Sequence, residues 1–298
     1  MPTVVDSEVQ HVEQSLMEAA GGHEQIEMYF GALIRQSIDE VVDGPRTGRI
    51  HFSSLTPEEK KYVGTKVEII LRNELEVPKG LLLDLNVRGV EVDIKWSQSS
   101  AWMIPQDYDD LRKHSQPPVC LLIGTQTEDS LEFNVGVARA VLMTGGRNRD
   151  GKGTLRASHI DQVVGQTAVW LVRRGRLSPT FLATLSPEAV ARIMGARKGQ
   201  ARVTQLFRET VGRPVPRSAV ETMAQQKDAL RRTRQDASRS VDSAMPFRVL
   251  SGAWKAHREA ALLLTGHVLK KDELMAVPHE ALARLPSALL SSISRDAR

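Results

Sequence analysis

Residues 84–95, in the first half of the chain, read DLNVRGVEVDIK. Apolar and polar residues alternate on both sides of a central Arg-Gly pair, which is typical of two strands joined by a tight turn. We therefore predict a hairpin with strands at 81–86 and 90–97. On the second strand Asp93 and Lys95 share one face, because side chains alternate between the two faces of a strand.

The hairpin is expected to bring a second carboxylate, Asp84, next to Asp93 and Lys95. Adjacent carboxylates repel each other unless a hard cation neutralises them, and Mg²⁺ is held by one or two carboxylates with phosphate oxygens and water. A neighbouring lysine can orient or help deprotonate the attacking water. Glu68, on a helix predicted just before the hairpin, is a candidate third acid.

This set predicts metal-assisted hydrolysis of phosphodiesters. The predicted catalytic residues are Glu68, Asp84, Asp93 and Lys95, and the three acids are the predicted metal ligands. An Asp-x-Lys pair alone more often marks a solvated strand face. The upstream acid at hairpin distance, the helix that carries Glu68 and the apolar alternation favour the catalytic interpretation.

Around the hairpin, the first half is predicted to be a mixed α/β domain. Apolar residues at helical spacing predict helix over 5–42, divided by a Gly-Gly pair. A second helical region, over 56–74, begins with Thr-Pro-Glu-Glu, a good helix start. Strands are predicted at 118–124 and 131–140, followed by a basic Gly-rich loop and a helix over 159–174.

From about residue 176 the predicted elements are mostly helices. A short strand at 180–185 and a helix that begins at Ser186 come first. Three further helices have the lengths and short joints of a helix-turn-helix unit, and they lie at 199–211, 217–225 and 228–240. The last predicted elements are a strand at 247–250, a candidate wing, and helices at 253–264 and 279–291.

The net charge differs between the two halves of the chain. Residues 1–150 carry 15 Lys and Arg against 24 Asp and Glu, a net charge of −9. Residues 151–298 carry 25 against 12, a net charge of +13. Such asymmetry is typical of a chain in which one half meets a polyanion. The alternative explanation is that the surface charges of the two halves are unrelated to each other and to any partner.

Composition excludes several classes of protein. The chain has 298 residues, of which 41% are apolar and 26% charged, as in soluble globular proteins. Its longest candidate membrane stretch, at 260–269, falls short of the roughly 20 apolar residues of a spanning helix. The start of the sequence shows no secretory signal pattern, so we expect a cytoplasmic protein. One cysteine, Cys120, excludes disulfide scaffolds, zinc fingers and CxxC redox enzymes, and its apolar strand predicts that it is buried.

Several sequence blocks resemble the NaeI-type restriction endonucleases, a family of type II enzymes in the PD-(D/E)xK nuclease superfamily. They stand in the same order as in that family, and together they are specific although no single block is. The blocks are DGPRTGR at 43–49, GTKVEI at 64–69, SAWMIP at 100–105, NRD at 148–150, GQARV at 199–203 and LFR at 206–208. The resemblance covers both halves of the chain and extends to about Arg239.

The resemblance implies an α/β endonuclease domain with a mixed sheet and flanking helices over 1–165. A linker at 166–177 and a mostly helical helix-turn-helix or winged-helix domain over 178–298 would follow. The implied activity is Mg²⁺-dependent, sequence-specific cleavage of both strands of double-stranded DNA by a homodimer, within a restriction-modification system. The C-terminal domain of this family binds a second, effector copy of the recognition sequence.

The family's catalytic positions match the residues that the hairpin pattern selects. By analogy Asp84 and Asp93 ligate Mg²⁺, Lys95 positions the nucleophilic water, and Glu68 supports the metal or its water. The charge difference between the halves fits the division into a cleaving and a DNA-binding domain.

Candidate DNA contacts lie in two basic segments and at one arginine. Side chains at the start of the third predicted helix can reach base edges in a major groove; they are Gln225, Gln226, Lys227, Arg231, Arg232 and Arg234. The loop before the 159–174 helix can contact DNA near the cleavage site, through Arg147, Asn148, Arg149 and Lys152. Arg202 is a candidate phosphate contact. A solvated helix face and a surface loop are the alternative interpretations of these segments.

Other functions are alternatives to DNA cleavage. A DNA-binding regulator with an inactive nuclease-like domain would bind tightly without metal-dependent turnover, although a retired site has no physical reason to keep mutually repelling acids beside a lysine. A nicking or repair nuclease would cut one strand or prefer damaged duplexes. The residues at 41–44 resemble the Lys-x-Asp-Gly of DNA ligases, but Val41 replaces the lysine that would carry the nucleotide.

Overall fold

The computed structural model describes residues 5–99, 101–105, 117–125, 132–141, 152–197, 199–225 and 246–296. The chain divides into two compact units. Unit 1 contains Met1–Val41 and Phe52–Pro179, and unit 2 contains Val42–His51 and Thr180–Arg298. The ten-residue segment Val42–His51, which separates the two parts of unit 1 in the sequence, therefore belongs to unit 2.

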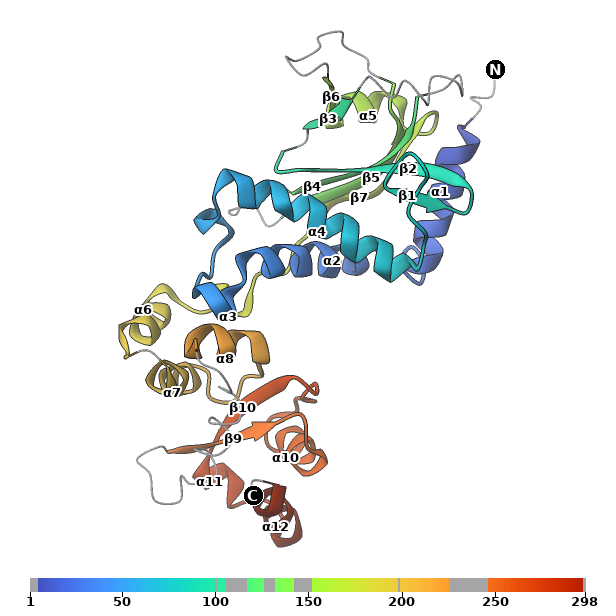
Figure 1. Ribbon diagram of the computed structural model, residues 1–298. Helices are drawn as coiled ribbons and strands as arrows, with labels where there is room; N and C mark the ends of the chain where they lie inside the picture. Colours follow the sequence, from blue (N-terminus) through green and yellow to red (C-terminus); the bar gives the residue numbers. More distant parts are fainter. Residues whose placement is uncertain are drawn as a thin grey trace. The chain divides into compact units, whose positions relative to one another are not determined.

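Three long helices open unit 1, as the apolar spacing predicted (Figure 1). Helix α1 (Ser7–Ala19) is capped by the Asp6 carboxylate, and the Gly-Gly break separates it from α2 (Ile26–Val42). Helix α4 (Pro57–Leu75) starts with a capping box, in which the Thr56 hydroxyl and the Glu59 carboxylate each accept a backbone N–H of the other residue.

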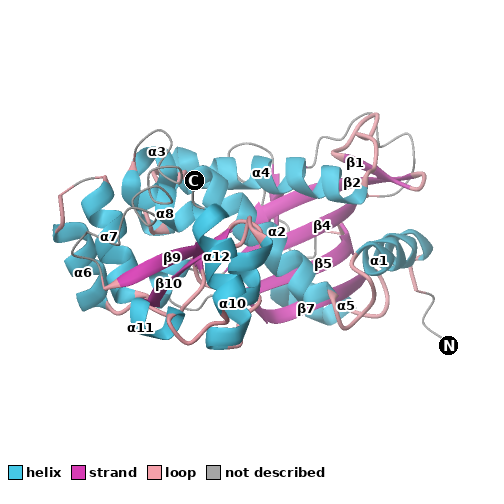
Figure 2. Cartoon of the chain, turned by 90° about the horizontal axis from the view of Figure 1, so that it is seen from below, coloured by secondary structure: helices cyan, strands magenta, loops and turns pink. Residues whose placement is uncertain are grey.

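A five-stranded mixed sheet in the order β1-β2-β4-β5-β7 forms the centre of unit 1, and Figure 2 shows the strands side by side. The strands are β1 (Leu85–Val87), β2 (Val90–Ser97), β4 (Val119–Thr125), β5 (Glu132–Arg139) and β7 (Ala168–Arg176). Strands β2 and β4 run parallel, whereas the other neighbours are antiparallel. The predicted hairpin is confirmed as β1-β2, although β1 is shorter than predicted. Its turn residues, Arg88 and Gly89, have φ values of 50° and 95°, as a tight two-residue hairpin loop requires.

Different elements cover the two faces of this sheet. Helices α2 and α4 lie along one face in Figure 1. The other face carries α5 (Ala157–Val163) and an antiparallel pair of strands, β3 (Ala101–Pro105) and β6 (Lys152–Arg156). Buried side chains of these elements, such as Trp102 and Leu155, pack with Cys120 and Leu122 of β4 in one apolar core.

The predicted helix over 159–174 is wrong in its second half. Helix α5 ends at Val163, and Gly165 follows with a φ of 79°, a conformation that side chains disfavour. The residues after this turn form β7, where Val169 and Val172 are β-branched and suit a strand. Strands β3 and β6 were not predicted, because each is only five residues long and its partner is distant in sequence.

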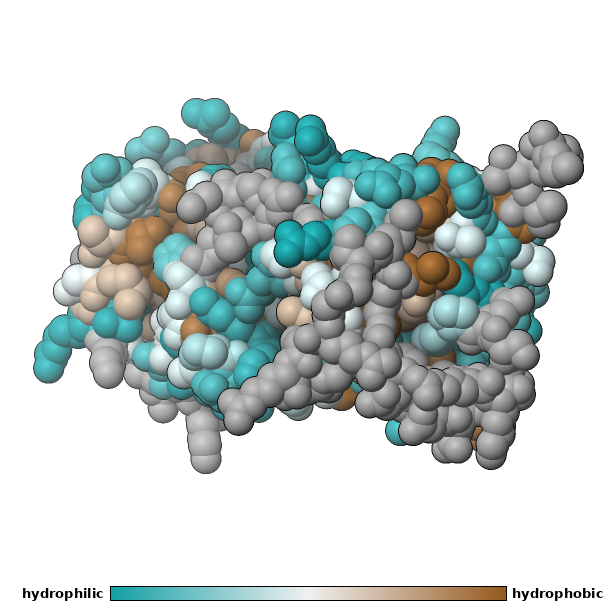
Figure 3. Space-filling view, turned by 90° about the horizontal axis from the view of Figure 1, so that it is seen from above, coloured by the Kyte–Doolittle hydropathy of each residue, from teal (hydrophilic) through white to brown (hydrophobic). Residues whose placement is uncertain are grey.

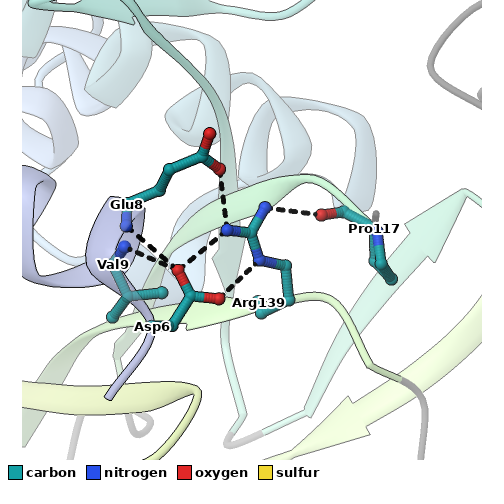
Figure 4. Close-up of polar contacts among 5 residues, drawn as sticks. All are labelled: Asp6, Glu8, Val9, Pro117 and Arg139. Atoms are coloured by element: carbon teal, nitrogen blue, oxygen red, sulfur yellow. Dashed lines mark hydrogen bonds and ion pairs between the residues drawn. The ribbon is translucent and has the colours of Figure 1, made fainter. Parts of the chain in front are cut away.

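Ion pairs fix α1 to the sheet (Figure 4). The buried Arg139 of β5 donates hydrogen bonds of 2.8 Å to both carboxylate oxygens of Asp6, one of 2.7 Å to Glu8 and one of 2.9 Å to the Pro117 carbonyl. The Arg139 guanidinium holds the pKa of Asp6 below its ordinary value. Because Asp6 also caps α1, one carboxylate joins the helix start to the central sheet.

Unit 2 is built on a three-stranded antiparallel sheet in the order β8-β10-β9. Its strands are β8 (Val215–Pro216), β9 (Phe247–Ser251) and β10 (Glu273–Pro278). Its longer helices are α6 (Pro187–Gly195), α7 (Gln200–Glu209), α8 (Arg217–Ala224), α10 (Lys255–Thr265) and α12 (Ser287–Asp296). They confirm the predicted helix that begins at Ser186 and those over 199–211, 217–225 and 253–264, whereas the one at 228–240 lies outside the described residues.

The side chains of β10 alternate between two cores. Leu274 and Ala276 pack with α6, α7 and α8, whereas Met275 and Val277 pack with α10, α11 (His279–Leu282) and α12. The sheet therefore lies between two helical layers. Strand β10 was not predicted, because both of its faces are buried. Its sequence therefore lacks the alternation of apolar and polar residues that is typical of a half-exposed strand.

Two predictions in unit 2 are wrong. The predicted strand at 180–185 is the 3-10 turn Phe181–Thr184, which the Thr180 hydroxyl caps. The predicted helix over 279–291 is two helices, α11 and α12, because Pro286 lies between them and cannot continue a helix.

Within the Val42–His51 segment of unit 2, residues Gly44–Thr47 form a short helix, α3, where a helix-ending turn was predicted. It packs closely on α8. A Cβ on Gly44 would lie 2.6 Å from the Thr222 hydroxyl oxygen, and the Gln225 side chain covers the backbone of Gly48. Residues from the first half of the sequence therefore complete the helical layer around α8.

Among the described residues, the exposed large apolar side chains lie on several elements. They include Met28 on α2, Leu81 before β1 and Leu262 on α10. On the face drawn in Figure 3, small apolar patches lie among hydrophilic residues. None of the helices in the described ranges is long and apolar enough to cross a membrane.

Candidate active site

Strand β2 sets the orientation of Asp93 and Lys95. In the parallel register with β4, Asp93 lies opposite Cys120 and Lys95 opposite Leu122. Both β4 residues belong to the apolar core on the face that β3, β6 and α5 cover. On the alternate positions, Trp96 faces α4, where its Cβ is 3.5 Å from the Cβ position of Gly64. Period-2 alternation therefore separates the charged face from the helix-packing face, as predicted.

Asp93 and Lys95 form an ion pair on this face. The Lys95 Nζ atom donates a hydrogen bond of 2.6 Å to Asp93 Oδ1 and a longer one of 3.4 Å to the Ile94 carbonyl. Only 4% of Asp93 is exposed, whereas Lys95 is partly exposed. A buried carboxylate needs such compensation, because an unpaired charge in the interior is costly.

Asp84 joins this pair through the backbone of β2. Its Oδ2 atom accepts a 2.7 Å hydrogen bond from the backbone N–H of Ile94, the residue between Asp93 and Lys95. The hairpin thus brings together the two acids and the lysine that the sequence pattern selected.

Glu68, on α4, interacts electrostatically with Asp84 and Lys95. Burial raises the pKa of this carboxyl above its ordinary value, and the neighbouring Asp84 charge raises it further. Arg72, whose Nη1 lies 3.6 Å from Glu68 Oε1, together with Lys79 and Lys95, opposes that rise. A carboxyl whose pKa is raised by a neighbouring acid is one that a cation would stabilise.

Cys120 is buried, as predicted, but it also borders the charged cluster. Its thiol donates to Asp93 Oδ2 at 3.9 Å. Burial first, and then the Asp93 charge, raise the pKa of this thiol well above its ordinary value. Cys120 therefore stays a neutral thiol against the second oxygen of Asp93. This contact could not be predicted from the sequence, because it depends on the parallel pairing of β2 with β4.

The donor set suits a hard divalent cation bound together with substrate. Within the described part of the chain, no three His, Cys, Asp or Glu side chains are placed to hold a metal ion by themselves. Two aspartates beside each other fit Mg²⁺, which is usually bound by one or two carboxylates plus phosphate oxygens and water. The carboxylates here are already engaged, Asp84 by Ile94 and Asp93 by Lys95.

The predicted DNA contacts are placed only in part. Most of them lie outside the described residues: Arg147, Asn148, Arg149, Gln226, Lys227, Arg231, Arg232 and Arg234. Lys152 is the first residue of β6. Arg202 donates to the carbonyls of Met194 and Ala196 and so holds the end of α6. Gln225 caps α8 in a left-handed conformation.

One side chain near the site was missed. Glu91 accepts hydrogen bonds from the backbone of the segment that leads into Asp84. The available signal was its position on β2, because Glu91, Asp93 and Lys95 alternate along one strand face.

Comparison with known proteins gives the chain its family. The family model described as "Restriction endonuclease NaeI" matches residues 26–286, which include both acids of the hairpin and most of unit 2. The chain belongs to this family. The match continues to residue 286, beyond Arg239, after which the resemblance of the sequence blocks fades.

A curated relative supports the same assignment. The type II restriction enzyme NaeI of Lentzea aerocolonigenes is 33% identical over 210 residues. The aligned stretch covers 68% of this chain and 62% of the relative, so the chain spans less than two thirds of the relative's length. The resemblance to NaeI-type enzymes that the sequence blocks indicated is thereby confirmed.

Proposed function

We propose that this member of the NaeI family is a type II restriction endonuclease that hydrolyses both strands of double-stranded DNA at a specific sequence. The observation that carries the proposal is the meeting of Asp84, Asp93 and Lys95 at the β1-β2 hairpin. A buried acid, a second acid and a lysine in one place suit phosphodiester hydrolysis. Membership in a family named for restriction endonucleases points to the same chemistry.

Mg²⁺ is the proposed cofactor, held by Asp84 and Asp93 and supported by Glu68. When bound, a divalent cation neutralises charge on the phosphate and on the attacking oxygen. The chain's own contribution is to bring acids of like charge together and keep them there. The N–H of Ile94 holds one oxygen of Asp84, and Lys95 holds one oxygen of Asp93.

Lys95 is the proposed residue that positions the nucleophilic water. Its ammonium group has three donor hydrogens, of which one points at Asp93 at 2.6 Å and a second is directed more weakly to the Ile94 carbonyl. Because Lys95 is partly exposed while Asp93 is buried, the lysine forms the boundary between the buried charge and solvent. A water beside Lys95 would therefore be oriented toward a phosphate bound at the acids.

Unit 2 is the proposed DNA-binding part. The sheet order β8-β10-β9, with α7 before β8 and α8 after it, is the connectivity expected of a winged helix. Its basic charge suits a DNA phosphate backbone. We propose that this unit binds a second, effector copy of the recognition sequence, and that two copies of the chain form a homodimer so that each strand meets one active site.

The substitution Asp93→Ala tests the site directly. It should lower Mg²⁺-dependent cleavage by at least about a thousandfold, because a metal ligand supports several kcal/mol of transition-state stabilisation. Binding to the same DNA, measured by gel shift in Ca²⁺, should persist. A variant that cleaves like the wild type would refute the site. Cleavage of only one strand by the wild type would favour a nicking enzyme instead.

A further inference from the structure

One carboxylate holds the loop that leads into the candidate active site. Glu91 on β2 accepts three backbone hydrogen bonds: from Leu81 at 2.8 Å to Oε1, and from Leu82 and Leu83 to Oε2 at 3.3 and 2.9 Å. The loop at 79–83 therefore wraps its amide groups around a single side chain. Hydrogen bonds to a charged acceptor are among the stronger ones in proteins.

Apolar packing contributes little at the tip of this loop. Leu81 is 94% exposed and Leu82 is 50% exposed, and the chain is buried again only at Leu83. Such an exposed segment would ordinarily fluctuate, since its ordering costs conformational entropy that packing does not offset. The three bonds to Glu91 are thus the main contacts that fix the tip.

Gly80 shows how closely the loop surrounds the carboxylate. A Cβ added at Gly80 would clash with Glu91 Oε2 and would lie 2.7 Å from the Leu83 carbonyl oxygen. The absence of a side chain at this position lets the backbone approach the acid.

The clamped loop ends at Asp84. That residue follows Leu83 directly, and its own carboxylate reaches the Ile94 N–H. Glu91, Asp93 and Lys95 occupy alternate positions of β2, so the residue that holds the loop shares a strand face with the catalytic pair. The loop also carries Lys79, whose charge partly opposes the rise in the pKa of Glu68.

From this arrangement we infer that Glu91 is a positioning residue, which sets the place of the Asp84 carboxylate for divalent metal by clamping the 79–83 loop. The inference rests on the proposed function, because Asp84 is taken as a metal ligand. Glu91 itself does not contact the reacting atoms. Partners that orient metal ligands typically change metal affinity by about 10–100-fold when they are removed.

The test uses the full chain with Glu91→Ala and Glu91→Gln, the second of which retains one acceptor oxygen. Asn86→Ala is the matched control, since Asn86 Oδ1 also accepts a backbone N–H, that of Gly89 at 2.7 Å, in the turn of the same hairpin. The readouts are amide hydrogen exchange at residues 81–83, titration with Mn²⁺ without DNA, and cleavage across a range of Mg²⁺ concentrations.

In Glu91→Ala we expect exchange at Leu81, Leu82 and Leu83 to become at least about tenfold faster, because the protecting bonds are lost. Mn²⁺ affinity should fall by about 10–100-fold, and the Mg²⁺ concentration for half-maximal cleavage should rise in step. Glu91→Gln should lie between this variant and the wild type. Asn86→Ala should leave exchange at 81–83 and Mn²⁺ affinity unchanged.

Two results would overturn the inference while the proposed function stands. One is unchanged exchange at 81–83 in both variants, and the other is faster exchange with wild-type Mn²⁺ affinity. A wild type that neither binds Mn²⁺ nor cleaves DNA would refute the proposed function, and the role of Glu91 with it. Wild-type exchange in β4 and β5 shows that a variant is folded, and if Glu91→Ala fails to fold, Glu91→Gln decides the outcome.

Discussion

The Oδ2 atom of Asp84 lies 2.7 Å from the backbone nitrogen of Ile94, the residue that separates Asp93 from Lys95. This hydrogen bond joins the segment before β1 to the middle of β2. It places the Asp84 carboxylate against the backbone of β2. The residues on either side of Ile94 are the second acid, Asp93, and the lysine, Lys95. The chemistry of the candidate site therefore depends on hairpin register as much as on residue type.

Replacing Lys95 by methionine should make the stability of the chain depend on divalent metal. Lys95→Met removes the ammonium group that pairs with the buried Asp93, and we expect a loss of about 2 kcal/mol in the free energy of unfolding, less than for a fully buried pair because the lysine is partly exposed. Added Mg²⁺ should then raise Tm more in the variant than in the wild type, because the metal replaces the lost charge.

The matched control for this variant is Lys66→Met. Lys66 donates to Glu40 at 2.9 Å, but Glu40 is 38% exposed, and exposed ion pairs contribute little. Thermal unfolding with Mg²⁺ and with EDTA should therefore distinguish the two variants. Equal responses to Mg²⁺ in both would count against a metal site at Asp93.

The ion pair between Asp6 and Arg139 should contribute stability only above acidic pH. Arg139 lowers the pKa of Asp6 in the folded state, so the contribution is present above the ordinary pKa of the carboxyl and is lost as pH falls through the lowered value. Asp6→Asn keeps the helix cap, because asparagine caps as well as aspartate. It should cost about 1 kcal/mol at pH 7 after allowance for solvent screening.

Urea unfolding of the wild type and Asp6→Asn between pH 7 and pH 3 checks this dependence. The difference between the two proteins should shrink toward zero at the acid end. Glu8→Gln serves as a comparison, because Glu8 bonds the same arginine but is exposed, and its effect should be smaller. The absence of any difference between the two proteins at pH 7 would show that Asp6 acts only as a cap, and a difference that does not change with pH would contradict the proposed ion-pair contribution.

The packing of α3 on α8 predicts that Gly44→Ala destabilises unit 2. The added Cβ would lie 2.6 Å from the Thr222 hydroxyl and 3.0 Å from the Arg49 carbonyl, and such overpacking costs about 1–3 kcal/mol. Hydrogen exchange should accelerate in α8 and not in β5. This pattern follows because residues 42–51 belong to unit 2.

Gly195→Ala is the matched control for that substitution. Its Cβ would meet no atom of the described residues within 4 Å, so we expect a stability change between zero and a gain of about 1 kcal/mol. Accelerated exchange in β5 rather than α8 in Gly44→Ala would contradict the assignment of α3 to unit 2.

Sequence reasoning recovered the parts of the fold that local patterns encode. The capped start of α4, the Arg-Gly turn of the hairpin and the shared face of Asp93 and Lys95 follow from spacing within a few residues. Strands β3 and β10 were missed for a physical reason. The first is short, consists of apolar residues and pairs with a distant partner, and the second is buried on both faces, so neither shows an alternation of apolar and polar residue types.

In the candidate site too, local sequence patterns predicted some features, whereas others depend on the fold. Asp84, Asp93, Lys95 and the helix that carries Glu68 could be selected from the sequence, because they lie on adjacent elements. The contact of Cys120 with Asp93 needs the parallel register of β2 with β4. The clamp by Glu91 needs the path of the loop before β1, which no periodicity encodes.

We propose that this chain cleaves DNA at a specific sequence, and incubation with DNA of known sequence tests this proposal. The wild type would be incubated with supercoiled plasmid and with a long, sequence-diverse DNA, each with Mg²⁺ and with EDTA. We predict discrete fragments with Mg²⁺ alone, whose mapped ends share one sequence. Intact DNA that nevertheless shifts on a gel would contradict the claim and favour a DNA-binding regulator.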